Sequence, residues 1–147
     1  MSGEERPAGI LGRIGAPAPD SSVPASPVDV LLVDADREFR AGVARLLRRN
    51  AHTVVEVGGA EEGIEAVRGG CAPRLLVVGL EPPGAAAREP LAALRALGPC
   101  AGVALLVLCR TEADVPAGLR PSTTLLKPVE ATELVEAVRR LCGSAPT

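Results

Sequence analysis

The chain has 147 residues, of which 47% are hydrophobic and 1% aromatic, and its formal net charge at pH 7 is −2. This length predicts one domain with an ample core, and the scarcity of aromatic residues favours α/β layers packed with aliphatic side chains. The weak net charge gives no indication of a nucleic-acid partner. No apolar run is long enough to span a membrane and the first residues lack the pattern of a signal peptide, so we expect a cytoplasmic protein.

The first 27 residues contain five prolines with several glycines and serines, and few large apolar side chains. So few apolar groups cannot offset the entropy lost when such a segment becomes ordered, and we expect residues 1–27 to form a disordered tail. The pattern predicts one domain over residues 28–143, followed by a short tail at 144–147.

Five short apolar runs predict strands, at residues 28–33, 52–57, 73–79, 102–108 and 123–126. Apolar residues recur at helical spacing after the first, second, third and fifth of these runs. The first helix should begin with Asp36 as its N-cap, and its polar face, which includes Arg40, should lie largely in water. The connection from residue 110 to 122 is broken by prolines and a glycine, so it leaves room for only a stunted fourth helix.

Strands that alternate with helices require right-handed crossovers, which predict a parallel sheet with helices on both faces. We expect an α/β fold, a doubly wound (βα)5 three-layer sandwich with a parallel five-stranded sheet of strand order 2-1-3-4-5. In that order the first and third strands are adjacent. Asp34, Asp36 and Gly79 should therefore meet at the carboxyl edge of the sheet, with Cys109 and Lys127 nearby.

Four cysteines are spread along the chain without a C-x-x-C motif or a histidine cluster: Cys71, Cys100, Cys109 and Cys142. Such spacing predicts neither a zinc site nor a disulfide framework. We expect small thiols buried in the core.

Short motifs stand at the ends of the expected strands: Asp34-Ala35-Asp36 after the first, Gly79-Leu-Glu-Pro-Pro-Gly84 after the third, Cys109 after the fourth and Lys127-Pro128 after the fifth. In this order and at these places they resemble the receiver domains of two-component response regulators. The resemblance covers residues 28–143. It implies an acidic pair after the first strand and an aspartate after the third that bind Mg²⁺, and it implies that the latter aspartate accepts a phosphoryl group from a histidine kinase.

The resemblance also shows where this chain departs from the family. Asp34 matches the first acid, but Ala35 stands in the place of the second, and Gly79 occupies the phospho-acceptor position. Because glycine has no carboxylate nucleophile, we expect no phospho-acceptor and no catalytic residue. Mg²⁺ prefers six oxygen ligands, commonly including one or two carboxylates. Only Asp34 and Glu81 could contribute here, so we expect no metal site and no cofactor, with Mg²⁺ bound weakly at most.

Two further positions follow from the resemblance. Lys127 matches the family's lysine, and we expect it to form a salt bridge with Asp34. Cys109 stands in the place of a serine or threonine. It is either a small residue that fills this position or a redox-sensitive thiol whose pKa is lowered by Lys127.

We therefore expect a stand-alone pseudo-receiver in two-component or phosphorelay-type signalling, which acts by protein contact without aspartyl phosphorylation and is not an enzyme. The partner would be a signalling protein such as a kinase or an output protein, bound through the face formed by the fourth helix, fifth strand and fifth helix. A homodimer through this face stays open, and neither nucleic acid nor a membrane is expected as a partner. The alternative is a module of the same fold that senses a small ligand or an oxidant.

Overall fold

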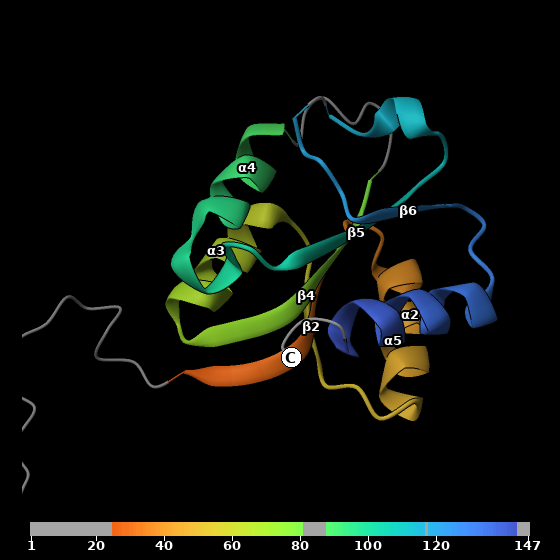
Figure 1. Ribbon diagram of the computed structural model, residues 1–147, viewed down its shortest axis with the longest axis horizontal. Coiled ribbons are helices and arrows are strands. Elements are labelled where there is room, and N and C mark those ends of the chain that lie inside the picture. Colours follow the sequence, from red (N-terminus) through yellow and green to blue (C-terminus); the bar gives the residue numbers. More distant parts are fainter. Residues whose placement is uncertain (1–24, 81–87, 117, 144–147) are drawn as a thin grey trace, which may run out of the picture.

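The computed structural model describes residues 25–80, 88–116 and 118–143, and it contains a five-stranded parallel sheet between two layers of helices (Figure 1). The strands are β2 (Ser26–Val33), β3 (Val54–Val57), β4 (Cys71–Gly79), β5 (Ala104–Cys109) and β6 (Thr123–Leu126). They lie in the order β3-β2-β4-β5-β6, and all neighbouring strands are parallel. Counted along the chain this is the order 2-1-3-4-5, which confirms the predicted doubly wound α/β fold.

The helices are α2 (Arg37–Arg49), α3 (Ala60–Arg68), α4 (Arg88–Ala96) and α5 (Ala131–Gly143), with short 3-10 helices η3 (Gly98–Cys100) and η4 (Glu112–Asp114). Figure 1 shows α2 and α5 on one side of the sheet and α3 and α4 on the other. The helical pattern after the third apolar run covers residues 85–97, and the first three of these residues lie outside the described residues. Within the described ranges, no helix combines the length and the apolarity needed to cross a membrane.

Each face of the sheet packs against its own layer of helices. Leu76 and Val78 of the central strand β4 face α3 and α4, whereas Leu75 and Val77 face α2 and α5. All four side chains are at most 1% exposed. Because both faces are covered, the strand is a continuous apolar run instead of an alternating one.

The first four strands each start two residues away from the prediction, β2 and β4 earlier and β3 and β5 later. β2 begins at Ser26, two residues before the expected start, and Ser26 pairs with Cys71 in β4. The sheet therefore takes in the last part of the segment expected to be a tail; residues 1–24 and 144–147 lie outside the described residues. β3 begins only at Val54. The backbone N–H of Thr53 donates a hydrogen bond of 3.1 Å to the Asp29 carboxylate, so it is not available to a backbone carbonyl of β2.

Two local predictions are confirmed. Asp36 caps α2, since its side chain accepts a hydrogen bond of 3.1 Å from the backbone N–H of Phe39. The connection between Cys109 and Thr123 forms only the three-residue η4 and, where it is described, contains no α-helix. The position of a fourth helix is therefore taken by an irregular segment.

Candidate functional site

The carboxyl edge of the sheet brings the predicted site residues together. Asp34 follows β2, and Gly79 ends the neighbouring strand β4. The backbone N–H of Lys127 donates a hydrogen bond of 2.7 Å to the carbonyl of Cys109, which joins the ends of β5 and β6. The predicted clustering of these positions is therefore confirmed.

Asp34 is the anchor of this site. Its side chain is fully buried, and Oδ1 accepts a hydrogen bond of 2.8 Å from the backbone N–H of Asp36. Oδ2 lies 3.8 Å from Nζ of Lys127, whose side chain is only 12% exposed. The predicted salt bridge is thus present, and its burial makes the loss of either partner costly.

Gly79 allows Asp34 to occupy this position. A Cβ atom added to Gly79 would overlap Oδ2 of Asp34 and would lie 2.6 Å from its Cγ. No side chain fits at residue 79 while Asp34 keeps its observed position. The Asp34 carboxylate therefore fills the space in which the side chain of a phospho-acceptor would begin.

Two residues of α2 complete the surroundings of this ion pair, and sequence reasoning missed both. The ring centroid of Phe39 lies 4.4 Å from Nζ of Lys127, a distance typical of a cation–π interaction. Arg40 was expected in water, and this was wrong. Its guanidinium donates a hydrogen bond of 2.7 Å to the carbonyl of Asp34, and its Nε lies 3.5 Å from a carboxylate oxygen of Glu56. The long side chain turns back over the end of β2, which helical periodicity alone does not reveal.

The remaining acidic positions do not build the family's metal site. Ala35 is exposed and offers no ligand side chain, and the Asp36 carboxylate is engaged as the helix cap. Within the described ranges, no group of three or more His, Cys, Asp or Glu side chains is arranged to hold a metal ion. Glu81, the other predicted weak ligand, lies outside the described residues. The residues present therefore do not fit the carboxylate set that the resemblance implies for Mg²⁺.

Cys109 is fully buried at the end of β5. Burial raises the pKa of its thiol, the nearby carboxylates of Asp114 and Glu112 raise it further, and the opposing effect of Lys127 is smaller. Lys127 does lower this pKa, but burial and the two carboxylates outweigh it, so the net direction favours the small residue that fills this position over the redox-sensitive thiol. The sequence alone did not show that η4 places two carboxylates near this thiol, and their effect on its pKa exceeds that of the single lysine.

The other cysteines behave alike. All four are free and buried, as predicted, and burial raises the pKa of Cys100 and of Cys142 to about 11. Thiols with such pKa values are mostly protonated at neutral pH and are therefore poor nucleophiles.

Iodoacetamide labelling of the folded protein should consequently be slow at Cys109 near neutral pH. Its rate should increase with pH and should level off only above the range of an ordinary thiol, because the thiolate fraction keeps growing until the pH exceeds the raised pKa. Peptide mapping by mass spectrometry after timed labelling between pH 6 and pH 10 measures this rate for each cysteine. Rapid labelling of Cys109 at pH 7 would show an accessible thiolate.

A cavity of about 530 Å³ lies beside the contact between Asp34 and Gly79. Ala35 and Gly79 form part of its wall, together with Gly59 at the start of α3 and Leu91 of α4. The space next to the site is therefore lined by small and apolar groups together with three acidic residues, Asp34, Glu61 and Glu62.

Comparisons with known proteins bear on the fold. No family model matches the chain, and no curated protein matches its sequence. Solved structures do match it. Chemotaxis protein CheY4 of Vibrio cholerae is 16% identical, with 79% of this chain and 99% of that chain covered and a TM-score of 0.67.

Two receiver domains of histidine kinases are similar to this chain as well. One is the receiver domain of sensor histidine kinase PA1611 from Pseudomonas aeruginosa, which was solved with a magnesium ion in its active-site cleft. It is 16% identical to this chain, the match covers 81% of this chain and 100% of that domain, and the TM-score is 0.64. The receiver domain of hybrid histidine kinase CckA is 25% identical, with coverages of 78% and 98% and a TM-score of 0.60. The chain thus has the fold of response-regulator receiver domains.

Proposed function

We propose that this protein is a pseudo-receiver in two-component or phosphorelay-type signalling, which acts by protein contact without aspartyl phosphorylation at the usual site. The signalling context is supported by the fold, since similar structures include a chemotaxis protein and receiver domains of histidine kinases. The domain would not be an enzyme and would need no metal cofactor.

The observation that carries this proposal is the contact between Gly79 and Asp34. An acyl phosphate forms on a carboxylate nucleophile, and residue 79 has none. The place for such a side chain is taken by the buried carboxylate of Asp34. Chemistry and space both support the proposal that this position accepts no phosphoryl group.

The ion pair supports a single fixed state. In the family the lysine pairs with the phosphoryl group, whereas here the ammonium of Lys127 lies beside Asp34 and against the Phe39 ring. Arg40 and the N–H of Asp36 hold Asp34 from two other sides. The ammonium that would pair with a phosphoryl group is thus already paired with an internal carboxylate.

Partner binding would use β6, α5 and the segment that replaces the fourth helix, with a kinase, an output protein or a second copy as the partner. Leu126 of β6 supports this. Its side chain is 48% exposed, and among the described residues no other large hydrophobic side chain is exposed. Neither nucleic acid nor a membrane is proposed as a partner.

A second candidate function is a small-ligand sensor of the same fold. The cavity of about 530 Å³ beside Ala35 and Gly79 favours it, since a pocket of this size accommodates a small molecule. Its lining of apolar groups with the acidic residues Asp34, Glu61 and Glu62 would suit a small ligand that combines an apolar part with a positive charge.

The test of the main proposal is intact-mass spectrometry after incubation with acetyl phosphate and Mg²⁺, with a conventional receiver domain as the positive control. We expect no phosphoryl adduct on this protein while the control is labelled. The variant Gly79→Asp should also stay unlabelled, because Ala35 still withholds a ligand and the new Cβ displaces Asp34. A phosphoryl adduct on the unmodified chain would show a working switch and overturn the proposal.

A further inference from the structure

A groove of about 480 Å³ lies between α4 and the segment that replaces a fourth helix. Ala92 and Ala96 of α4 form one wall, and Pro116 and Leu119 form the other. Both alanines are exposed, whereas Pro116 and Leu119 are buried. The small side chains of the two alanines thus leave space next to the apolar surface of Pro116 and Leu119.

Arg95 holds the two walls together. Its guanidinium donates hydrogen bonds to the carbonyls of Leu119 at 2.9 Å and Arg120 at 3.4 Å, and to that of Val103 at 3.4 Å. A single side chain of α4 thereby binds two consecutive residues of the irregular segment and also Val103, the residue directly before β5. The groove is therefore a built feature of the fold and does not depend on a flexible loop closing over a ligand.

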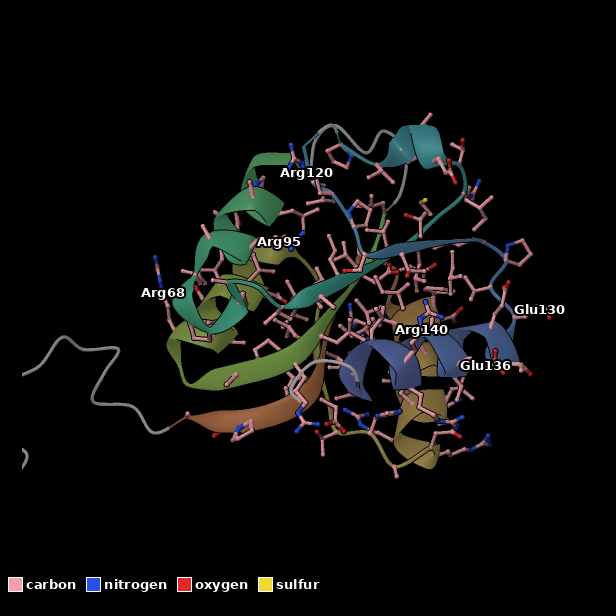
Figure 2. The ribbon with its side chains drawn as sticks, viewed as in Figure 1. Arg68, Arg95, Arg120, Glu130, Glu136 and Arg140 are labelled. Carbon is pink, nitrogen blue, oxygen red and sulfur yellow. The ribbon has the colours of Figure 1, made fainter. Side chains whose placement is uncertain are left out.

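The charges of this groove all have one sign. Its lining includes the guanidinium groups of Arg95 and Arg120 and, within the described residues, no carboxylate. Figure 2 labels Arg95 on α4 and Arg120 near one end of that helix, on the connection that follows β5. The formal net charge of the chain is −2, so this local positive charge is not a property of the whole surface. Guanidinium groups bind carboxylates through paired N–H donors.

We propose that this groove binds a peptide segment of a partner protein that carries an apolar side chain next to a carboxylate. The apolar side chain would lie over Leu119 between the two alanines, and the carboxylate would pair with Arg120 and with the remaining donors of Arg95. This proposal rests on the proposed function, because a pseudo-receiver that acts by contact needs such a surface. The partner would thus be recognised by an apolar side chain and an adjacent carboxylate.

A random peptide library displayed on phage and selected against the full chain tests this proposal. Enriched peptides should contain a large apolar residue within two positions of Asp, Glu or a free C-terminus. Their affinity should fall about tenfold or more on Ala96→Glu, which fills the groove and adds a repelling charge, and several-fold on Arg120→Gln. The matched control is Ala93→Glu, which places the same charge on an exposed position of α4 outside the groove lining and should leave the affinity unchanged.

Three results would overturn the proposal. They are a library without enriched peptides, enriched peptides whose binding is insensitive to Ala96→Glu, and enriched peptides that reproduce the chain's own residues 1–24. The last result would identify the chain's own N-terminal segment as the occupant in place of a partner. These results depend on peptide binding alone, whereas the mass measurement tests phosphorylation. Failure of the peptide-binding proposal can therefore be distinguished from failure of the proposed function.

Discussion

Replacing Gly79 with alanine should lower the free energy of unfolding by at least about 1–3 kcal/mol, the range for overpacking, because the new Cβ also pushes Asp34 away from its buried ion pair. The added Cβ would overlap the carboxylate of Asp34, whose Cβ atom would also be only 3.3 Å away. Asp34 must then rotate away from Lys127 and from the N–H of Asp36. Equilibrium denaturation in urea, followed by circular dichroism, measures the change.

Gly42 provides the matched control for this substitution. It lies within α2, is exposed, and a Cβ added there would meet no atom within 4 Å. Gly42→Ala should therefore stabilise the protein by about 0.5–1 kcal/mol, the difference in helix propensity between glycine and alanine. If Gly79→Ala were as stable as the unmodified chain, Asp34 would have room to move aside, and the proposed fixed state would lose its basis.

The sequence was sufficient to predict which residues meet at the sheet edge. Apolar runs that alternate with helical patterns permit few topologies, and the strand order then places the residue after each strand at the same edge. Asp34, Gly79, Cys109 and Lys127 could be brought together on this ground alone. The salt bridge followed, since Asp34 and Lys127 were the opposite charges expected at that edge.

The sequence was not sufficient to predict how the side chains at that edge arrange themselves. That Gly79 lacks a carboxylate can be read from the chain, but the filling of its place by Asp34 depends on a side-chain rotamer. Phe39 and Arg40 lie on α2, and their contacts with Lys127 and Asp34 depend on how that helix packs over the strand end. Periodicity assigns a residue to a face of a helix, but it does not say how far a long side chain reaches beyond that face.

The sequence left two interpretations of Cys109 open, for a different reason. Sequence reasoning considered only the nearest charge in the family pattern, Lys127. The carboxylates of Glu112 and Asp114 come close because the connection after β5 folds into a 3-10 turn in place of a full helix. A prediction that combines burial with the shortened connection would have given the correct direction of the pKa shift.

The second large effect is expected at Lys127. Lys127→Met keeps most of the aliphatic side chain but leaves the buried carboxylate of Asp34 without the ammonium 3.8 Å away. Loss of one partner of a buried ion pair costs about 3–5 kcal/mol, so we expect a fall of this order in the free energy of unfolding. Arg139→Met is the control, since Arg139 is exposed on α5 and its replacement should change stability by less than about 0.5 kcal/mol.

A double-mutant cycle separates the ion pair from simple loss of packing at Lys127. Asp34→Asn keeps an oxygen that can accept the hydrogen bond from the N–H of Asp36, but it removes the charge. In the combined variant, Lys127→Met no longer leaves a buried carboxylate unbalanced. The double variant should therefore be more stable than the sum of the two single losses implies, by about 0.5–3 kcal/mol. Additive losses would mean that the charges do not interact, and the carboxylate of Asp34 would then not hold Lys127 in the proposed fixed state.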